Sequence, residues 1–399
     1  MVRKILCALA LLLAAAPFLP AEGALSLDFS FDNGFIRTRE IDYADPLGPI
    51  VKDPYWGYGA GGSAGLSFKS LDKTNVRGDL SFAFNFPEQD PGIGTAIPII
   101  TLKKAFIKAR FPWFRLTAGK TRLGWGDGFV FNSGDVIFGS ISPYVDLTAR
   151  EIRSETGWLT AVNVPLGRFS FIEGVVLPPE GDAAAGRVLG NITETSGGGR
   201  IYAKITGIKA EAGYFYEGEE FPLHRPYLGL QGNLGIDWYL AASAAVPQDK
   251  DEDRKEYTRD TFNISCGLFH LQKTGYSGSM SFRLEGLIMP WGEWEESSPE
   301  KPEDIPVYGI LLYPEITYLP AETVSLSLRS VFSPVDMSAR ITAGTSWNVF
   351  QGFSLVCFGT FNAGGGRDTF PWSKEADLWQ PGVDFMDGIG FTAGVRFIY

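Results

Sequence analysis

The sequence of 399 residues predicts an all-β fold, a transmembrane, antiparallel, up-and-down β-barrel. Three observations predict it. Apolar and polar residues alternate with a period of two, short turns alternate with long polar loops, and aromatic residues gather near the ends of the expected strands. We expect about 18 strands, with short periplasmic turns, long extracellular loops and one loop folded into the lumen. A barrel of about 16 strands is the alternative, because strand boundaries drawn from sequence drift by about two to four residues.

The composition excludes several other classes of protein. Apolar residues make up 45% and aromatic residues 14% of the chain, and there are 48 Gly, which excludes a disordered or collagen-like chain. Only one apolar run approaches the length of about 20 residues that a membrane-spanning helix needs, which excludes a polytopic helical protein. A net charge of −11 argues against a nucleic-acid partner. With 2 His and 3 Cys in the chain, we expect no metal site and no cofactor.

The first residues have the layout of a secretory signal peptide. A basic start at Arg3 and Lys4 precedes an apolar run over residues 5–16, which is too short to span a bilayer. Small residues near the end of this segment offer a cleavage site. We therefore expect residues 1–23 to be a cleaved signal peptide and residues 24–399 to form a single barrel domain. Export through the inner membrane fits an outer-membrane location in a Gram-negative-type bacterium.

Residues 76–86 show the alternation clearly. Leu80, Phe82 and Phe84 fall on one face of an extended chain, whereas Asp79 and Ser81 fall on the other. A helix does not produce this pattern, and similar runs recur to the end of the chain. The expected strands cover residues 25–39, 56–70, 76–87, 100–111, 113–122, 155–164, 168–178, 196–206, 208–217, 225–233, 236–246, 257–273, 275–290, 307–318, 322–333, 337–349, 352–363 and 385–399.

Short turns and long loops alternate between these strands. Gly, Pro, Asn or Asp mark short turns such as 71–75 and 273–276, whereas the loops between them are longer and polar. Only the link at 333–337 breaks the rhythm. An even strand number places both chain ends on the short-turn side, as in a single-chain barrel. A soluble β-sandwich or propeller is the alternative, but closure into a barrel accounts for the lack of an obvious edge strand.

The last expected strand carries a more specific pattern. A polar residue, a glycine two positions later, an aromatic three further and a terminal aromatic follow one another as Thr392, Gly394, Phe397 and Tyr399. This ending resembles the C-terminal assembly signal of bacterial outer-membrane barrels. Members of that group most often end in Phe, so the terminal Tyr is a departure. The resemblance implies that the barrel-assembly machinery is a partner.

A second resemblance concerns residues 115–180. The matching positions are Gly119, Lys120, Arg122, Trp125, Gly126, Gly128, Phe131, Asn132 and Asp135. The segment resembles porin-like outer-membrane proteins, in which a basic strand end meets Trp-Gly-x-Gly and then Phe-Asn-Pro-x-Asp. Ser133-Gly134 replaces the usual proline-containing pair, which is a departure in the turn. The resemblance implies a passive or facilitated channel and identifies no solute.

Residues 124–150 are expected to form a constriction. The connection is long and contains apolar residues such as Phe129, Phe131 and Ile137. Folding into the barrel mouth would bury these side chains and narrow the lumen. The alternative is a loop that packs over the rim of the barrel.

The expected lumen wall is unevenly charged. Basic side chains lie opposite the apolar face on the strands around this loop. We expect the pore and its constriction to be lined by Arg77, Lys104, Lys108, Arg110, Arg115, Arg122, Trp125, Asp127, Asn132 and Asp135. Because rings of Arg or Lys favour anions, a weak anion preference is one reading. The other is that these cations pair with loop carboxylates and hold the loop in place.

These features favour a porin-like channel for small hydrophilic solutes. The alternatives are a surface adhesin or receptor that acts through its loops, and a transporter for hydrophobic compounds. An enzyme is not expected, because neither His224 nor His270 has a nucleophile or a carboxylate at a supporting spacing. The expected partners are outer-membrane lipid and a small hydrophilic solute, and assembly into a homo-oligomer is left open.

Overall fold

The computed structural model describes most of the chain. The described residues are 23–39, 41–42, 50–51, 53–70, 75–86, 99–149, 152–179, 190–219, 221–249, 253–297, 307–373 and 385–398. The signal peptide expected over residues 1–23 therefore lies outside them except for its last residue, and so does Tyr399 of the expected assembly signal.

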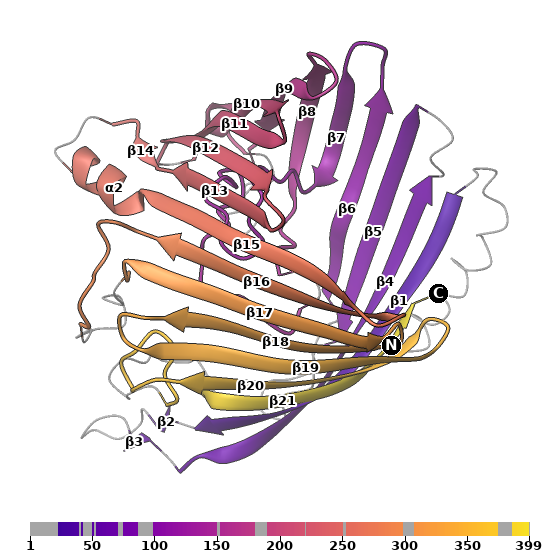
Figure 1. Cartoon of the computed structure of the whole chain (residues 1–399), viewed down its shortest axis with the longest axis vertical. Coiled ribbons are helices and arrows are strands. Elements are labelled where there is room, and N and C mark those ends of the chain that lie inside the picture. The colour runs from indigo at the N-terminus through magenta and orange to yellow at the C-terminus, as the bar shows by residue number, and fades with distance from the viewer. Residues whose placement is uncertain are drawn as a thin grey trace.

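One antiparallel sheet closes on itself to form a barrel (Figure 1). It contains 19 strands, of which β14 (Val246–Pro247) has two residues, and the other 18 form the barrel wall. The first strand, β1, pairs with both β4 and the last strand, β21, which completes the closure. The predicted fold class and the strand number are therefore confirmed.

The wall strands follow one another in chain order. They are β1 (Gly23–Arg39), β4 (Tyr55–Ser70), β5 (Val76–Phe86), β6 (Ile99–Arg110), β7 (Arg115–Thr121), β8 (Gly157–Pro165), β9 (Ser170–Leu177), β10 (Ser196–Ile205), β11 (Ile208–Glu217), β12 (Leu223–Asn233), β13 (Asp237–Ser243), β15 (Asn263–Thr274), β16 (Gly278–Ile288), β17 (Ile310–Ala321), β18 (Val324–Ser333), β19 (Ser338–Phe350), β20 (Phe353–Ala363) and β21 (Phe385–Ile398). A separate hairpin of β2 (Ile41–Asp42) and β3 (Ile50–Val51) lies in the first long connection, and a 3-10 turn, η2 (Ile192–Glu194), precedes β10.

Alternation along the strands separates the two faces of the wall. On β16, Arg283 and Glu285 point into the barrel, whereas Phe282 and Leu284 point outward and are 38% and 47% exposed. Large apolar side chains on the outer face remain exposed around the wall, as Ile107 at 58% and Phe31 at 50% show. Such a surface is stable against lipid hydrocarbon and unfavourable against water.

One expected strand begins too early. The sequence predicts a strand over residues 257–273, but residues 254–261 form a helix, α2 (Arg254–Thr261), and β15 begins at Asn263. The run between Tyr257 and Phe262 is charged and polar without alternation. Thr258 and Thr261 donate hydrogen bonds to carbonyls four residues earlier, which a helical turn brings within reach. Among the described residues, no helix has the length and apolar character needed to cross a membrane.

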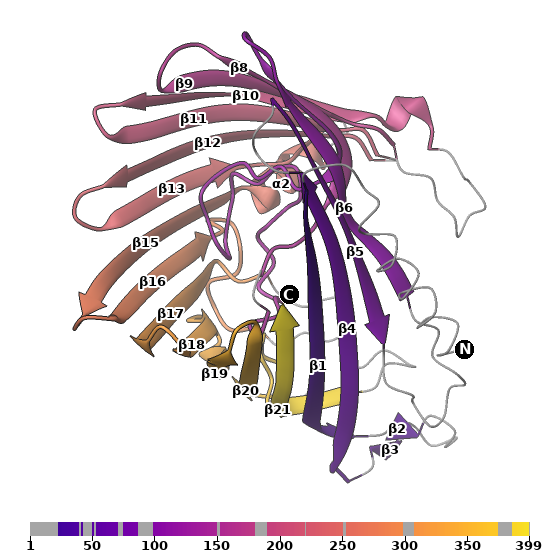
Figure 2. The same cartoon turned by 90° about the vertical axis from the view of Figure 1, so that its right-hand side faces the viewer.

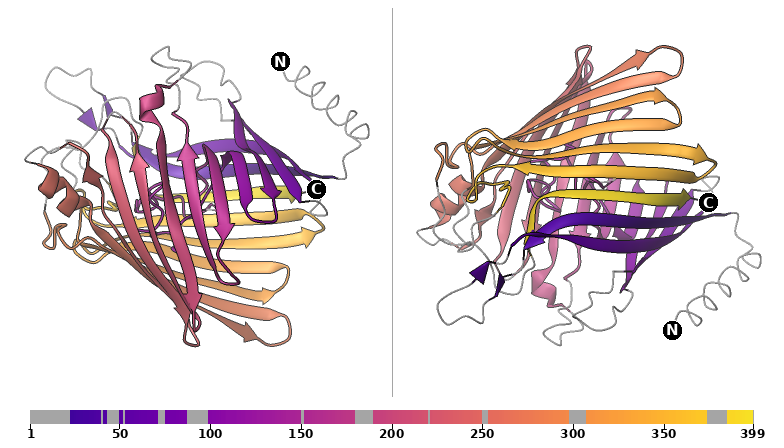
Figure 3. Two further views of the ribbon diagram at one scale, coloured as in Figure 1. Left: turned by 90° about the horizontal axis from the view of Figure 1, so that it is seen from above. Right: turned by 90° about the horizontal axis from the view of Figure 1, so that it is seen from below.

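The connection between β7 and β8 does not project from the barrel. Residues 122–156, which we call the inner loop, run as a purple coil between the strand walls in Figure 2. The views along the other axis in Figure 3 also place this coil within the ring of strands. Two apolar clusters lie where the inner loop meets the wall, one around Trp125 and one around Phe131.

Candidate functional site

The inner loop is attached to β16 by a carboxylate. Glu285, which is 1% exposed, accepts hydrogen bonds from the backbone amides of Phe129, Val130 and Phe131 at 2.9, 2.8 and 3.0 Å. Hydrogen bonds to an ionised acceptor are roughly twice as strong as neutral ones. Tyr239 of β13 adds a bond from its hydroxyl to the Phe131 carbonyl at 2.9 Å. The central part of the loop is thus fixed to the inner wall.

A cation holds the far part of the loop. Arg329 on β18 donates through Nη1 to the carbonyls of Leu147 and Ala149 at 2.9 and 3.0 Å. Its Nε also pairs with Glu315 of β17 at 3.1 Å. The guanidinium therefore joins two wall strands to the loop in a single planar group.

Trp125 packs against a different part of the wall, formed by β9, β10 and β12. The side chain is fully buried, and its Nε1 donates to Glu173 of β9 at 3.0 Å. Its ring stacks on Tyr227 of β12 at 5.7 Å between centroids. Arg200 of β10 lies over the same ring and pairs with Glu173 at 2.9 Å and with Glu211 at 3.1 Å. Tryptophan is suited to this position because its one polar group finds a partner while the ring is buried.

Steric constraints require glycine at positions 126 and 128 of the Trp-Gly-x-Gly segment. Gly126 adopts φ +73°, a left-handed conformation that glycine adopts without strain. At Gly128, a Cβ would lie 2.1 Å from the carbonyl oxygen of Phe131. Asn132 closes the turn, since its amide donates to the Trp125 carbonyl at 2.9 Å and its oxygen accepts from the Gly134 amide.

The backbone of Ser133 attaches the inner loop to the wall. The backbone amide of Ser133 donates to Ser265 Oγ of β15 at 2.9 Å. A proline at this position has no N–H and could not form this bond. Ser133 therefore adds a further attachment of the inner loop to the wall.

Asp135 stabilises the loop from within. It is 1% exposed, pairs with Arg122 and accepts from Ser140 Oγ at 2.5 Å. Arg122 also reaches Glu155 at 2.5 Å near the return into β8. Burial raises the pKa of Asp135 above its ordinary value, although Ser140 and Arg122 oppose the shift.

The contacts of the inner loop are concentrated on one side of the barrel. Hydrogen bonds, ring contacts and the two apolar clusters join it to every long strand from β8 to β18. Within the described residues, no such contact joins it to the inner faces of β20, β21, β1, β4 and β5. We call these five inner faces the bare arc. Many of the side chains on the bare arc are small, namely Ser30, Gly34, Gly59, Gly61, Ser63, Gly65, Ser81, Ala83, Gly390, Thr392 and Gly394. Charged residues share the same inner faces, namely Asp28, Asp32, Lys69, Asp79 and Arg396.

The predicted pore cations lie on the inner face but near the short turns. Arg110 ends β6 and pairs in register with Arg115 at the start of β7, and Arg77 pairs with Lys108. Lys104 lies further along β6. Among the described residues, no carboxylate forms an ion pair with Lys104, Lys108, Arg110 or Arg115. By contrast, the cations beneath the inner loop are paired with carboxylates, as Arg200 and Arg329 are.

The other predicted site residues divide into two groups. Trp125, Asn132 and Asp135 are buried and maintain the shape of the inner loop, so they do not face a solute. Asp127 is exposed at a turn of the loop, and Arg122 is half-buried beside Asp135. Their role in a constriction stays a prediction. Sequence reasoning missed three wall partners of the loop, Glu285, Glu173 and Tyr239. It placed Arg329 on the inner face by alternation, but the sequence does not show what Arg329 contacts.

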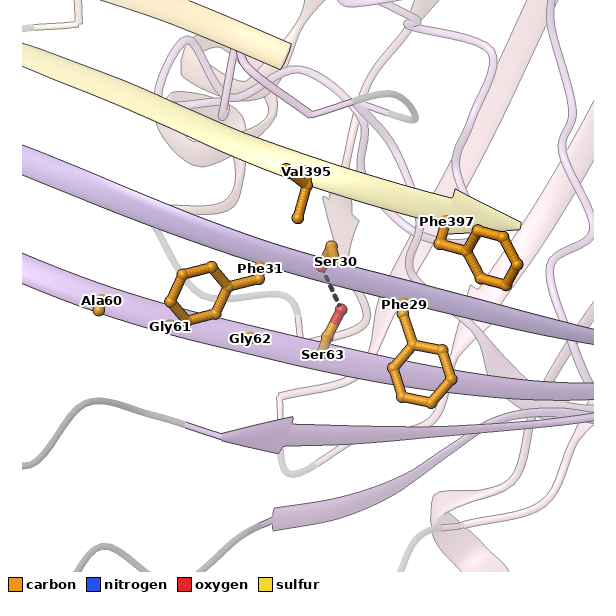
Figure 4. Close-up of a pocket in the computed structure, with 9 residues that line it drawn as sticks. All are labelled: Phe29, Ser30, Phe31, Ala60, Gly61, Gly62, Ser63, Val395 and Phe397. Carbon is orange, nitrogen blue, oxygen red and sulfur yellow. Dashed lines mark hydrogen bonds between the residues drawn. The ribbon is translucent and has the colours of Figure 1, made fainter. Parts of the chain in front are cut away.

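A hollow on the outer face of the wall is lined mainly by apolar groups. Figure 4 shows it across β1, β4 and β21, where Phe29, Phe31 and Phe397 project beside Gly62. Its volume is about 440 Å³, and it forms because Gly62 has no side chain beneath the ring of Phe31. Ser30 and Ser63 form a 2.7 Å hydrogen bond across the same two strands. This hollow belongs to the exposed aromatic face, so it is not the route of a hydrophilic solute.

Comparison with known proteins supports the architecture. No protein-family model matches the chain, and no curated protein matches it. Among solved structures, the chain is similar to OccK11 (OpdR) of Pseudomonas aeruginosa, with 10% identity, coverage of 94% of this chain and 96% of that one, and a TM-score of 0.51. OccK8 (OprE) of the same organism gives 9% identity, 94% and 98% coverage, and a TM-score of 0.50. An anion-selective porin from Comamonas acidovorans gives 12% identity, 95% and 100% coverage, and a TM-score of 0.45.

The likeness concerns the fold. A closed barrel of 18 antiparallel strands with an apolar outer face has the architecture of outer-membrane porins and channels.

Proposed function

We propose that this protein is a passive outer-membrane channel for small hydrophilic solutes, narrowed by the inner loop. The observation that carries the proposal is the one-sided attachment of that loop. Wall contacts hold it from β8 to β18, while the bare arc carries many Gly, Ser, Ala and Thr residues with charged residues such as Asp32 and Arg396 among them. Small side chains leave space between the loop and the wall, and the polar ones favour a wet path. Solutes therefore pass along the bare arc.

Liposome swelling and single-channel conductance test this proposal. Purified protein is expected to admit small sugars and amino acids and to conduct ions. Deletion of residues 126–146 is expected to raise the conductance, because it removes the loop from the lumen. Deletion of α2 (Arg254–Thr261), which lies in another long connection, is the control and should leave conductance unchanged. A barrel that is sealed in both assays contradicts the proposal and favours a surface receptor. An unchanged conductance after loop deletion contradicts the constriction.

The proposal includes a weak anion preference. Its support is the difference between the paired cations under the loop and the group of Lys104, Lys108, Arg110 and Arg115, which have no described carboxylate partner. Cations that outnumber nearby acids beside a narrow path raise the local concentration of anions. The reversal potential across a salt gradient should have the sign of anion selectivity, and Lys108→Gln with Arg115→Gln should move it toward zero. Clear cation selectivity of the unaltered protein contradicts this part.

The export and assembly features belong to the same proposal. Cleavage of residues 1–23 is checked by the mass of the mature protein. Recognition of Thr392, Gly394, Phe397 and Tyr399 by the assembly machinery is checked by the outer-membrane yield of Tyr399→Ala. Gly394 has an additional structural role, because a Cβ there would lie 2.1 Å from Asp32 Oδ1 on β1. A Gly394→Ala variant therefore alters closure as well as the signal, whereas Tyr399→Ala tests the signal.

A further inference from the structure

A polar cavity lies between the inner loop and the wall, on the side away from the bare arc. It has a volume of about 390 Å³ and is bounded by Asp127 of the loop and by residues of β11, β12, β13, β15 and β16. Sites for small molecules in proteins typically have volumes of about 300–1,000 Å³. Its wall residues, among them Lys209, Gln231 and Asp237, lie within a few residues of the short turns. The cavity is therefore on the short-turn side of the inner loop.

Asp127 provides a carboxylate that the protein itself does not use. The tight packing of Gly126 and Gly128 against Asn132 leaves no room for side chains there, and Asp127 projects from the turn between them. No hydrogen bond or ion pair joins Asp127 to another described residue. Partial removal from water raises the pKa of Asp127, and the positive charges of Lys209 and Arg200 partly oppose this shift. A carboxylate in this position is available to a cationic group of a ligand.

Cationic groups face the same cavity. Lys209 at the start of β11 donates one hydrogen bond to Gln231 Oε1, and its ammonium has two further protons. Arg283 is held by two rings, with its Cζ 4.0 Å from the centroid of Phe129 and 5.1 Å from that of Phe269. Its contacts with Glu285 and Glu315 are long, at 3.5 and 3.4 Å. Both cations can therefore donate to an added acceptor.

The acids of the wall that line the cavity, Glu285 and Asp237, already accept hydrogen bonds from the protein. Glu285 is saturated by the amides of the inner loop, and Asp237 accepts from Asn233 at 2.6 Å. The groups left for a ligand are one carboxylate on the loop and cations on the wall. Because both signs are present, neither a simple anion nor a simple cation satisfies the whole lining. A neutral sugar satisfies neither charge.

We propose that this cavity binds small zwitterionic solutes, with the ammonium group at Asp127 and the carboxylate at Lys209 and Arg283. This inference rests on the proposed channel function and adds a class of solute to it. It also gives the inner loop a second role, since the loop supplies one of the two binding charges.

L-Alanine, acetate, ethylammonium and glucose are the probes that test it. Each is titrated into the purified full-length protein in detergent by calorimetry, and each is added to single channels in symmetric salt. L-Alanine should bind and interrupt the current, and the three other probes should do so at least tenfold more weakly. Asp127→Asn and Lys209→Gln should each weaken L-alanine binding at least tenfold. Asp260→Asn and Lys255→Gln, on the exposed helix α2, remove the same charges elsewhere and should leave it unchanged.

The outcomes separate the two proposals. An ion-conducting protein on which L-alanine has no effect overturns the cavity site and leaves the channel in place. Binding of acetate or glucose as tight as that of L-alanine, or L-alanine binding that survives both cavity variants, also overturns it. A protein that does not conduct overturns the channel, and calorimetry then tests the cavity by itself. Retained ionic conductance in the two variants shows that they still fold and insert.

Discussion

The Glu285 carboxylate of β16 accepts a hydrogen bond from the backbone amide of Val130 at 2.8 Å, across 155 residues of sequence. The amides on either side of Val130 donate to the same carboxylate. One side chain of the wall thus fixes three consecutive residues of the inner loop. The protein's own groups therefore hold this part of the inner loop against the wall.

Glu285→Ala is expected to loosen the inner loop. Each buried amide left without an acceptor costs about 1–3 kcal/mol, which exceeds the worth of most single contacts in the loop. The expected result is a higher and noisier single-channel conductance and a lower urea midpoint of unfolding. Glu285→Gln keeps one acceptor oxygen, so its conductance and unfolding midpoint should lie between those of the unaltered protein and of Glu285→Ala. Glu256→Ala on α2 is the control, and a conductance of Glu285→Ala equal to that control contradicts the anchoring role.

Gly128→Ala and Gly124→Ala form a matched pair within the inner loop. A Cβ at Gly128 would lie 2.1 Å from the Phe131 carbonyl oxygen, whereas a Cβ at Gly124 would have nothing within 4 Å. Overpacking of this kind costs about 1–3 kcal/mol. Gly128→Ala should therefore lower the unfolding midpoint and raise current noise, and Gly124→Ala should do neither. Equal behaviour of the two variants would mean that the loop conformation differs from the one described.

The strands could be predicted because their pattern is local. Alternation in residues 76–86 or 337–349 reports directly which side chains face lipid, and glycine and proline mark the turns between runs. The strand start expected at residue 257 was wrong because Tyr257 and Phe262 were assigned to one strand, whereas Tyr257 belongs to the helix α2 (Arg254–Thr261) and the strand begins at Asn263. A short helix within a long loop has no apolar period to reveal it.

The candidate site could be predicted only in part. The long connection with its own apolar residues indicated a segment that packs against something, and the structure shows the partners. These partners depend on contacts between residues far apart in sequence, such as Ser133 with Ser265 or Ala149 with Arg329. Single-sequence patterns do not encode which strand a loop reaches. Alternation predicted that basic residues such as Lys108 and Arg115 point inward. Their position along the barrel axis, near the short turns, follows from the strand register.

Asp135 makes the stability of the inner loop depend on pH. Burial holds its folded pKa above the ordinary value of 3.8, so the folded protein binds this proton more tightly than the unfolded chain. The free energy of unfolding is then expected to fall as the pH rises from the pKa of the unfolded chain through that of the folded protein. At a pH below both values the carboxyl is protonated in both states, so it does not lower the stability. Urea midpoints measured from pH 3.5 to 7 check this, with Asp135→Asn as the reference that has no titrating carboxyl. If the difference between the two proteins changes with pH in the opposite direction, the pKa is lowered and the assignment is wrong.

Cysteine accessibility distinguishes the bare arc from the wall beneath the inner loop. Both native barrel cysteines, Cys266 and Cys357, are free and are first replaced by alanine. Ser63→Cys then places a thiol on the bare arc of β4, and Ala161→Cys places one on β8 in the cluster around Trp125, where Ala161 is 3% exposed. A charged, membrane-impermeant methanethiosulfonate reagent should react with the first thiol and lower the current in a step, because the added group occupies the path. The second thiol should not react while the loop is in place, and it should become reactive when Ala161→Cys is combined with Glu285→Ala. Faster block through residue 161 than through residue 63 would place the path beneath the loop instead.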